Sequence, residues 1–154
     1  MLRQFLLQVL WAMLSTLGFG LMYQMRTKKL LFAALGGALS WSIYYLCMRV
    51  NLHEMTAYAV AAGTGTLFSE IMARILKTPV TVFVVPVNIA MVPGGALFHS
   101  MLALMEQDTA RFIERGRYTL SVAGAIALGI FIATMFFRII SQSLSIMRRK
   151  ADGA

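Results

Sequence analysis

The residues with the greatest chemical potential lie in one apolar stretch, VTVFVVPVNIAMVPGGALFHSMLAL, at residues 80–104. Within it stand two prolines, an asparagine and a glycine pair: Pro86, Asn88, Pro93, Gly94 and Gly95. A proline removes a backbone donor and crowds the preceding turn, so it kinks or breaks a helix. In a bilayer the freed carbonyls need partners inside the protein or in a wet cavity. Because transporters build binding sites from such broken helices, the stretch predicts a substrate site.

Three groups beside the predicted break could recognise a solute. The exposed amides after Pro93 could face an anionic group, as the N-termini of half-helices do. Asn88 could donate to a carboxylate, or it could bond a carbonyl that the kink leaves unpaired. His99 could relay a proton, because histidine changes its charge most readily near neutral pH, or it could simply face other helices. The predicted substrate-binding residues are Pro86, Asn88, Pro93, Gly94, Gly95 and His99.

A second group of charged residues lies near the end of the preceding apolar block. Glu70 precedes Arg74 by one helical turn, which is the favourable order for an ion pair on a helix. The simpler interpretation is an ion pair at the membrane boundary, with Arg74 reaching towards water. The functional interpretation is a carboxylate that couples a proton or faces the substrate. Together with Lys77, these residues are the predicted coupling or gating residues.

Five apolar blocks must position these residues, and each is near the roughly 20 residues that span a bilayer. They cover residues 5–23, 30–48, 55–72, 80–104 and 118–140. The blocks predict an all-α integral membrane protein in which residues 1–154 form a single transmembrane domain. It has about five transmembrane helices, the fourth broken by proline and glycine; a four-span arrangement with one re-entrant block is the alternative. The first block has no clear cleavage site of small residues, so we expect a retained helix.

The composition excludes several classes of protein. Of the 154 residues, 59% are hydrophobic and 13% charged, where a soluble domain would carry about 25% charged residues. The net charge of +8 would suggest nucleic-acid binding in a soluble protein. Here the basic residues separate or follow the apolar blocks, where they set topology and meet anionic lipid, so we expect no nucleic-acid partner. Cys47 is the only cysteine, which excludes an intrachain disulfide.

The sequence also lacks the common signatures of catalysis and cofactor binding. It contains no Walker loop, dinucleotide glycine motif or zinc-ligand spacing. We therefore expect no cofactor, no metal and no enzymatic activity.

The basic residues predict the orientation. With five spans, the first loop, the third loop and the C-terminal tail share one side, which carries eight lysines and arginines against five on the other. Because the more positive side is cytoplasmic, the N-terminus should lie outside and the C-terminus in the cytoplasm.

Small residues four positions apart recur in the third and fifth blocks: Ala59 with Gly63, Ala61 with Gly65, and Ala125 with Gly129. Such spacing lets two helix backbones approach closely in lipid. Because five helices leave few to enclose a polar path, we expect an oligomer in which this chain supplies part of the pathway.

Three segments resemble the threonine/serine exporter family, and more narrowly its small subunit, which corresponds to the C-terminal half. They are SEIMARILKTP (69–79), VPVNIAMVPGGALFHSMLAL (85–104) and TLSVAGAIALGI (119–130), and the order of all five blocks also fits. The resemblance implies a bacterial inner-membrane antiporter of two homologous halves, with a larger homologous subunit as partner. It implies export of threonine and serine driven by the proton motive force. Split relatives are implicated in export of dicarboxylates such as succinate.

The resemblance also bears on single residues. Glu70 and Arg74 fall on the family's motif, which supports a functional role for both. Family members often have another proline near Asn88 and an aromatic residue near His99, so this chain departs from the family there.

We predict from these observations a subunit of a secondary-active exporter for small polar metabolites, with threonine and serine as leading substrates. One alternative is a non-transporting accessory subunit, in which substitutions around the break would change complex yield and not substrate preference. A channel is a second alternative. An intramembrane enzyme ranks last, because it needs paired acidic or histidine residues deep in facing helices, and only His99 is placed deep by the sequence.

Overall fold

The computed structural model describes residues 2–152, with side chains for residues 3–26 and 28–143. This part of the chain contains six α-helices and no strand, which confirms the all-α prediction. The helices are α1 (Leu2–Met22), α2 (Thr27–Arg49), α3 (Glu54–Ile75), α4 (Thr81–Ile89), α5 (Gly94–Met105) and α6 (Thr109–Asp152).

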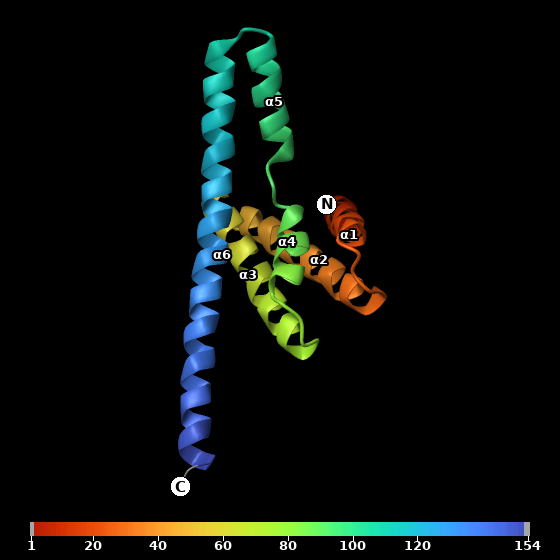
Figure 1. The fold of residues 1–154 in the computed structure, drawn as a ribbon. Coiled ribbons are helices and arrows are strands. Elements are labelled where there is room, and N and C mark those ends of the chain that lie inside the picture. Colours follow the sequence, from red (N-terminus) through yellow and green to blue (C-terminus); the bar gives the residue numbers. More distant parts are fainter. Residues whose placement is uncertain (1, 153–154) are drawn as a thin grey trace.

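The helix α3 lies at the centre of the arrangement. It packs against α2, α4 and α6, while α1 packs on α2 and contacts α4. The helix α5 leaves this group and, among the described helices, packs only along α6 (Figure 1). The long helix α6 runs from the turn beside α5 to the C-terminal end, past the side of α3. The chain therefore forms a four-helix group, α1 to α4, and a hairpin of α5 with the first part of α6.

Three helices are long and apolar enough to cross a membrane, namely residues Arg3–Met22, Lys28–Arg49 and Thr109–Ser143. The pair of α4 and α5 adds a fourth candidate if it counts as one bent span. The helix α3 has 22 residues but is too polar to join this set, since it carries threonines, a serine and Glu70. Its central place accommodates part of this composition, because Thr66 and Ser69 are buried among the packed helices. The third span stays a prediction.

The fourth block is broken, as predicted, and the break comes after Asn88. The helix α4 ends at Ile89 and α5 begins at Gly94, with a bend of 62° between them. Pro86 is buried inside α4. The helix continues past it because the loss of one N–H leaves the other hydrogen bonds of the helix intact. Pro93 stands immediately before α5, where a missing N–H removes no helical bond.

The fifth block begins earlier than its apolar run. We expected a charged loop over residues 105–117, but α6 already begins at Thr109 and only three residues separate it from α5. The carboxylate of Asp108 explains the early start, because its Oδ1 accepts a bond of 3.0 Å from the amide of Arg111. Gln107 provides the tight turn in the left-handed conformation (φ 59°).

Small residues bring α3 and α6 together, which confirms the packing role predicted for them. A Cβ on Gly129 would overlap the backbone carbonyl of Ala59, and one on Gly63 would come within 3.3 Å of the Gly129 oxygen. On another face of α3, a Cβ on Gly65 would overlap Ser40 Oγ and lie 3.0 Å from Val87. The two glycine faces of α3 therefore fix its approach to α6 and to the α2–α4 side.

Candidate functional site

Asn88 is the most buried of the polar residues at the break. It is 5% exposed and lies on the inner face of α4. Its Nδ2 donates to Thr66 Oγ1 at 3.3 Å and to the Val84 carbonyl at 3.0 Å. The carbonyl that Pro86 deprives of a donor is that of Val82, so Asn88 does not repair the kink. Its Oδ1 is buried without a hydrogen-bond partner in the described part of the chain.

Asn88 is one of five buried polar residues on the packed helices α1 to α4, and we call this set the polar seam. Its members are Thr16 of α1, Ser40 of α2, Thr66 and Ser69 of α3, and Asn88 of α4. Three of the hydroxyls donate to a carbonyl one turn earlier on their own helix, at 2.8–2.9 Å. The Oγ of Ser40, like Asn88 Oδ1, has no partner among the described residues. Buried polar atoms are normally hydrogen-bonded, so two unpaired oxygens in one seam mark it as a candidate binding site.

A cavity of about 250 Å³ lies beside the first residue of the break. Its wall contains two polar residues, two tryptophans and two alanines, namely Gln8, Ser15, Trp11, Trp41, Ala12 and Ala90. The indole Nε1 of Trp41 donates to Gln8 Oε1 at 3.4 Å, which joins α1 to α2 across it. Gln8, Ser15 and Trp41 are not among the residues predicted for the site. No local pattern in the sequence could have identified them, because 33 residues separate Trp41 from Gln8.

The glycine pair that follows the break is open to its surroundings. Gly94 and Gly95 are exposed, and a Cβ at either would have nothing within 4 Å. The Gly94 amide bonds the Val92 carbonyl at 2.7 Å, and the Leu97 amide bonds the Pro93 carbonyl at 3.0 Å. The amides of Gly95 and Ala96 have no backbone acceptor among those described. They are therefore the two donors of the predicted helix N-terminus that a solute could use.

Replacing Asn88 separates its role in stability from its role in recognition. We expect Asn88→Leu to change the free energy of unfolding by less than about 1 kcal/mol, because removal of a buried acceptor that has no partner offsets the loss of the two bonds that Nδ2 donates. Asn88→Asp should lower stability by several kcal/mol, because an unpaired charge would be buried. Unfolding of the purified chain by dodecyl sulfate in mixed micelles measures both changes, with Thr66→Val as the matched removal of one bond. Equal losses for the leucine and aspartate variants would contradict this account.

His99 lies away from the polar seam. It is exposed on α5, with its ring edge-on to Phe98 at a centroid distance of 5.6 Å. It lines a different cavity, between α5 and α6, together with Glu106, Arg111 and Arg115. Asn88 and His99 flank the break in the sequence, but the structure places them in separate surroundings.

The predicted coupling residues lie at the end of α3. Glu70 is half-buried, and no ion pair joins it to Arg74 in the described part of the chain. The Arg74 guanidinium instead lies over the ring of Phe137 on α6, 4.7 Å from its centroid. A cation over an aromatic ring is attracted to it by roughly 0.5–1 kcal/mol even when the charge stays exposed to solvent. This attraction explains why Arg74 lies against Phe137. Lys77 is exposed and forms the left-handed turn (φ 49°) that ends α3.

A polar link between α3 and α6 was not anticipated. The hydroxyl of Tyr118 donates to Glu54 Oε1 at 2.5 Å. Tyr58, one turn after Glu54, packs against Tyr44 of α2 with the two rings tilted and their centroids 4.6 Å apart. The link joins residues 64 positions apart, so no local sequence pattern indicates it.

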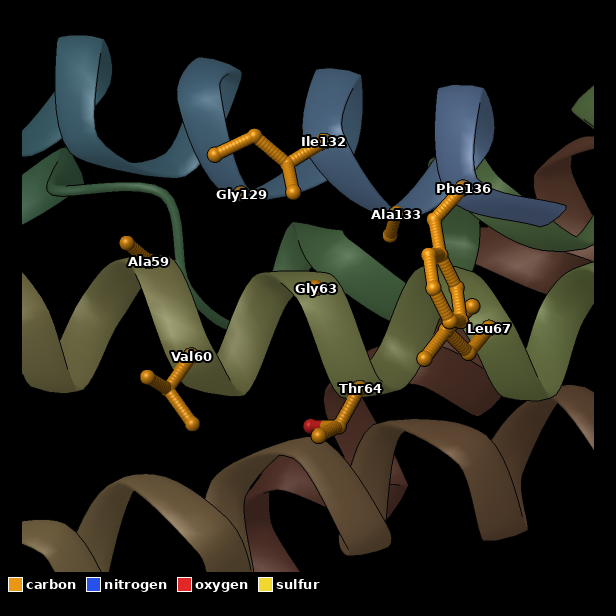
Figure 2. A pocket seen from close by; sticks show the side chains of 9 residues that line it. All are labelled: Ala59, Val60, Gly63, Thr64, Leu67, Gly129, Ile132, Ala133 and Phe136. Carbon is orange, nitrogen blue, oxygen red and sulfur yellow. The ribbon is translucent and has the colours of Figure 1, made fainter. Parts of the chain in front are cut away.

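An apolar groove of about 310 Å³ lies between α3 and α6 (Figure 2). Its walls come from both helices: Ala59, Val60, Gly63, Thr64, Leu67, Gly129, Ile132, Ala133 and Phe136. Figure 2 shows the close approach of the two ribbons at Gly63 and Gly129. The groove carries no charged group, so it offers nothing to hold a polar solute; an acyl chain or an apolar helix suits it better.

The comparisons with known proteins give one match. The model of the family described as Threonine/Serine exporter, ThrE, matches residues 8–136, which include all the helices from α2 to α5, most of α1 and much of α6. The comparisons with curated proteins and with solved structures give no match. Among the described residues, no three histidine, cysteine or acidic side chains are grouped to hold a metal ion.

Proposed function

This chain belongs to the threonine/serine exporter family, and we propose that it is one subunit of a secondary-active exporter working with a larger homologous subunit. Membership makes it a membrane transport protein. The finer proposal is export of threonine and serine by antiport with protons across the bacterial cytoplasmic membrane.

The observation that carries the proposal is the buried, unpartnered Oδ1 of Asn88 just before a 62° helix break. Irregular backbone at membrane depth is tolerated where it is buried in protein or lines a wet cavity. An acceptor without a partner in such a place supports binding of a solute that donates hydrogen bonds. Threonine and serine carry an ammonium and a hydroxyl, and either group could donate to this oxygen.

The same break offers donors for the other end of the substrate. The amides of Gly95 and Ala96 open the helix α5, where the aligned backbone dipoles favour negative charge. The substrate carboxylate would accept from them while its ammonium or hydroxyl group donates to Asn88. Pro86 and Pro93 set the direction of the two short helices that carry these groups.

The exposed backbone groups at the break support the presence of a partner subunit. The exposed Gly94 and Gly95 and the free amides beside them would face lipid in an isolated chain. Unpaired amides in hydrocarbon cost several kcal/mol each, so another subunit or water must cover them. The larger homologous subunit is our proposed cover.

Proton coupling is assigned to Glu70 at the cytoplasmic end of α3, with Arg74 and Lys77 as gating residues. Glu70 is half-buried and has no ion-pair partner in the described chain, which leaves its carboxylate open to exchange a proton. The proposed orientation has the N-terminus outside and the C-terminus inside.

Efflux from cells tests this proposal. Cells without their own exporters are loaded with a threonine-containing dipeptide, and the threonine released is followed with this chain alone, with a candidate larger subunit alone, and with both. We expect gradient-dependent efflux only with both. Efflux with this chain alone would replace the partner with a homo-oligomer. Succinate efflux without threonine efflux would assign a dicarboxylate substrate, and neither efflux, with both proteins in the membrane, would favour an accessory role.

A further inference from the structure

A cavity of about 270 Å³ lies between α5 and α6, at the end of the hairpin that projects from the four-helix group (Figure 1). Its walls carry both signs of charge: Glu106, Arg111 and Arg115, with His99, Leu102 and Ala103. It is smaller than the roughly 300–1,000 Å³ pockets that hold drug-sized ligands, so it suits a small solute. The other cavities described above carry no charged side chain.

The charges in this cavity are largely unpaired. Within the described residues, the one ion pair joins Arg111 to Asp108 at 3.4 Å, and Asp108 lies in the turn outside the cavity. Within the described residues, the side chains of Glu106 and Arg115 have neither an ion pair nor a hydrogen bond. Opposite charges that face one small cavity without pairing leave both available to a ligand that carries the complementary pair.

The sequence explains how the two signs come together. Arg111 and Arg115 are four residues apart, so they share one face of α6. Glu106 follows the end of α5, and the three-residue connection turns α6 back along α5. The early start of α6 at Thr109 is therefore what brings the arginines beside His99 and Glu106.

We propose that this cavity binds a small amino acid by both charges, with Glu106 holding the α-ammonium group and Arg115, assisted by Arg111, holding the α-carboxylate. Guanidinium groups match a carboxylate with two parallel donors, and a carboxylate is the natural acceptor for an ammonium. The identity of the solute rests on the proposed function. The cavity would be a second station on the route, separate from the polar seam.

Equilibrium binding tests the assignment on the purified full chain in nanodiscs of phosphatidylglycerol. Three ligands are compared: L-threonine, threoninol without the carboxylate, and N-acetylthreonine without the ammonium. Glu106→Gln should raise the Kd about tenfold for threonine and threoninol and leave N-acetylthreonine unchanged. Arg115→Gln should weaken threonine and N-acetylthreonine equally and leave threoninol unchanged.

The matched control is Arg117→Gln, because Arg117 is exposed on the same helix but does not line the cavity. It should leave all three affinities unchanged. If it weakens them as much as Arg115→Gln, or if both cavity variants weaken every ligand alike, the proposal is overturned. Because Glu106 and Arg115 are exposed, the folded chain should persist in each variant, which thermal unfolding checks.

Two further binding measurements distinguish the amino-acid site from a lipid-headgroup site and from a site at Asn88. Phosphatidylethanolamine carries the same pair of charges in its headgroup, so binding is repeated in nanodiscs that contain it. A threonine affinity within about twofold of the first value supports the amino-acid site, whereas loss of about tenfold would assign a lipid headgroup and overturn the proposal. Binding is also measured in the Asn88→Leu variant. Binding that persists there and still depends on Glu106 supports the cavity even if the efflux experiment fails.

Discussion

Replacing Gly129 by alanine is expected to destabilise the protein by about 1–3 kcal/mol, although alanine is the better helix former. The new Cβ would overlap the carbonyl oxygen of Ala59 and lie near its Cα and carbonyl carbon. These are backbone atoms of α3, so no side-chain rotation can relieve the overlap. The helices α3 and α6 must separate, and the groove between them must open. Unfolding by dodecyl sulfate in mixed micelles measures the change.

The same helix supplies the control. Gly124 is exposed, and a Cβ there would have nothing within 4 Å. Gly124→Ala should therefore leave the free energy of unfolding unchanged or raise it by up to about 1 kcal/mol. If the two alanine variants unfold alike, α3 and α6 do not approach each other as closely as the structure places them.

Gly94→Leu is expected to reduce threonine export at least tenfold while the amount of protein in the membrane stays the same, a barrier increase of about 1.4 kcal/mol or more. Nothing in this chain lies within 4 Å of a Cβ at Gly94, and its φ does not require glycine. The chain can therefore accommodate leucine. A loss of export would then show that the substrate or the partner uses the open space at the break.

Gly18→Leu is the matched control for this variant. Gly18 is exposed on α1 and also has nothing within 4 Å of a Cβ, but it lies outside the break. It should export at the wild-type rate. Normal export by the Gly94→Leu protein, in the efflux assay and at equal membrane content, would show that the site is assigned to the wrong residues.

The features of the fold that depend on local chemistry could be predicted from the sequence. The apolar runs predicted the helices, and the proline and glycine residues predicted the break, because both signals act within one or two helical turns. The continuation of α4 through Pro86 could not be predicted, since a helix tolerates this proline once the surrounding helices bury it. The predicted start of the last helix was also wrong, because the cap at Asp108 begins α6 nine residues before the apolar run.

The candidate site was less accessible to sequence reasoning, because its contacts join distant segments. Asn88 was identified correctly as a polar residue at the break, but its partner Thr66 lies on another helix, 22 residues away. The spacing of Glu70 and Arg74 favoured an ion pair, yet the ring of Phe137 lies beside Arg74 only after α6 packs on α3. The same packing creates the Tyr118–Glu54 bond. The reversal of α5 into α6 likewise places His99 among charges and away from Asn88.

Counterflow in proteoliposomes tests the central claim most directly, namely that substrate passes the break beside Asn88. Vesicles that contain the chain, with the larger subunit if efflux requires it, are loaded with unlabelled L-threonine and diluted into labelled L-threonine. The account predicts transient accumulation of label for the wild-type protein and less than about a tenth of it for Asn88→Leu, at equal protein content. Equal accumulation by the two proteins, or none by the wild type, would contradict it.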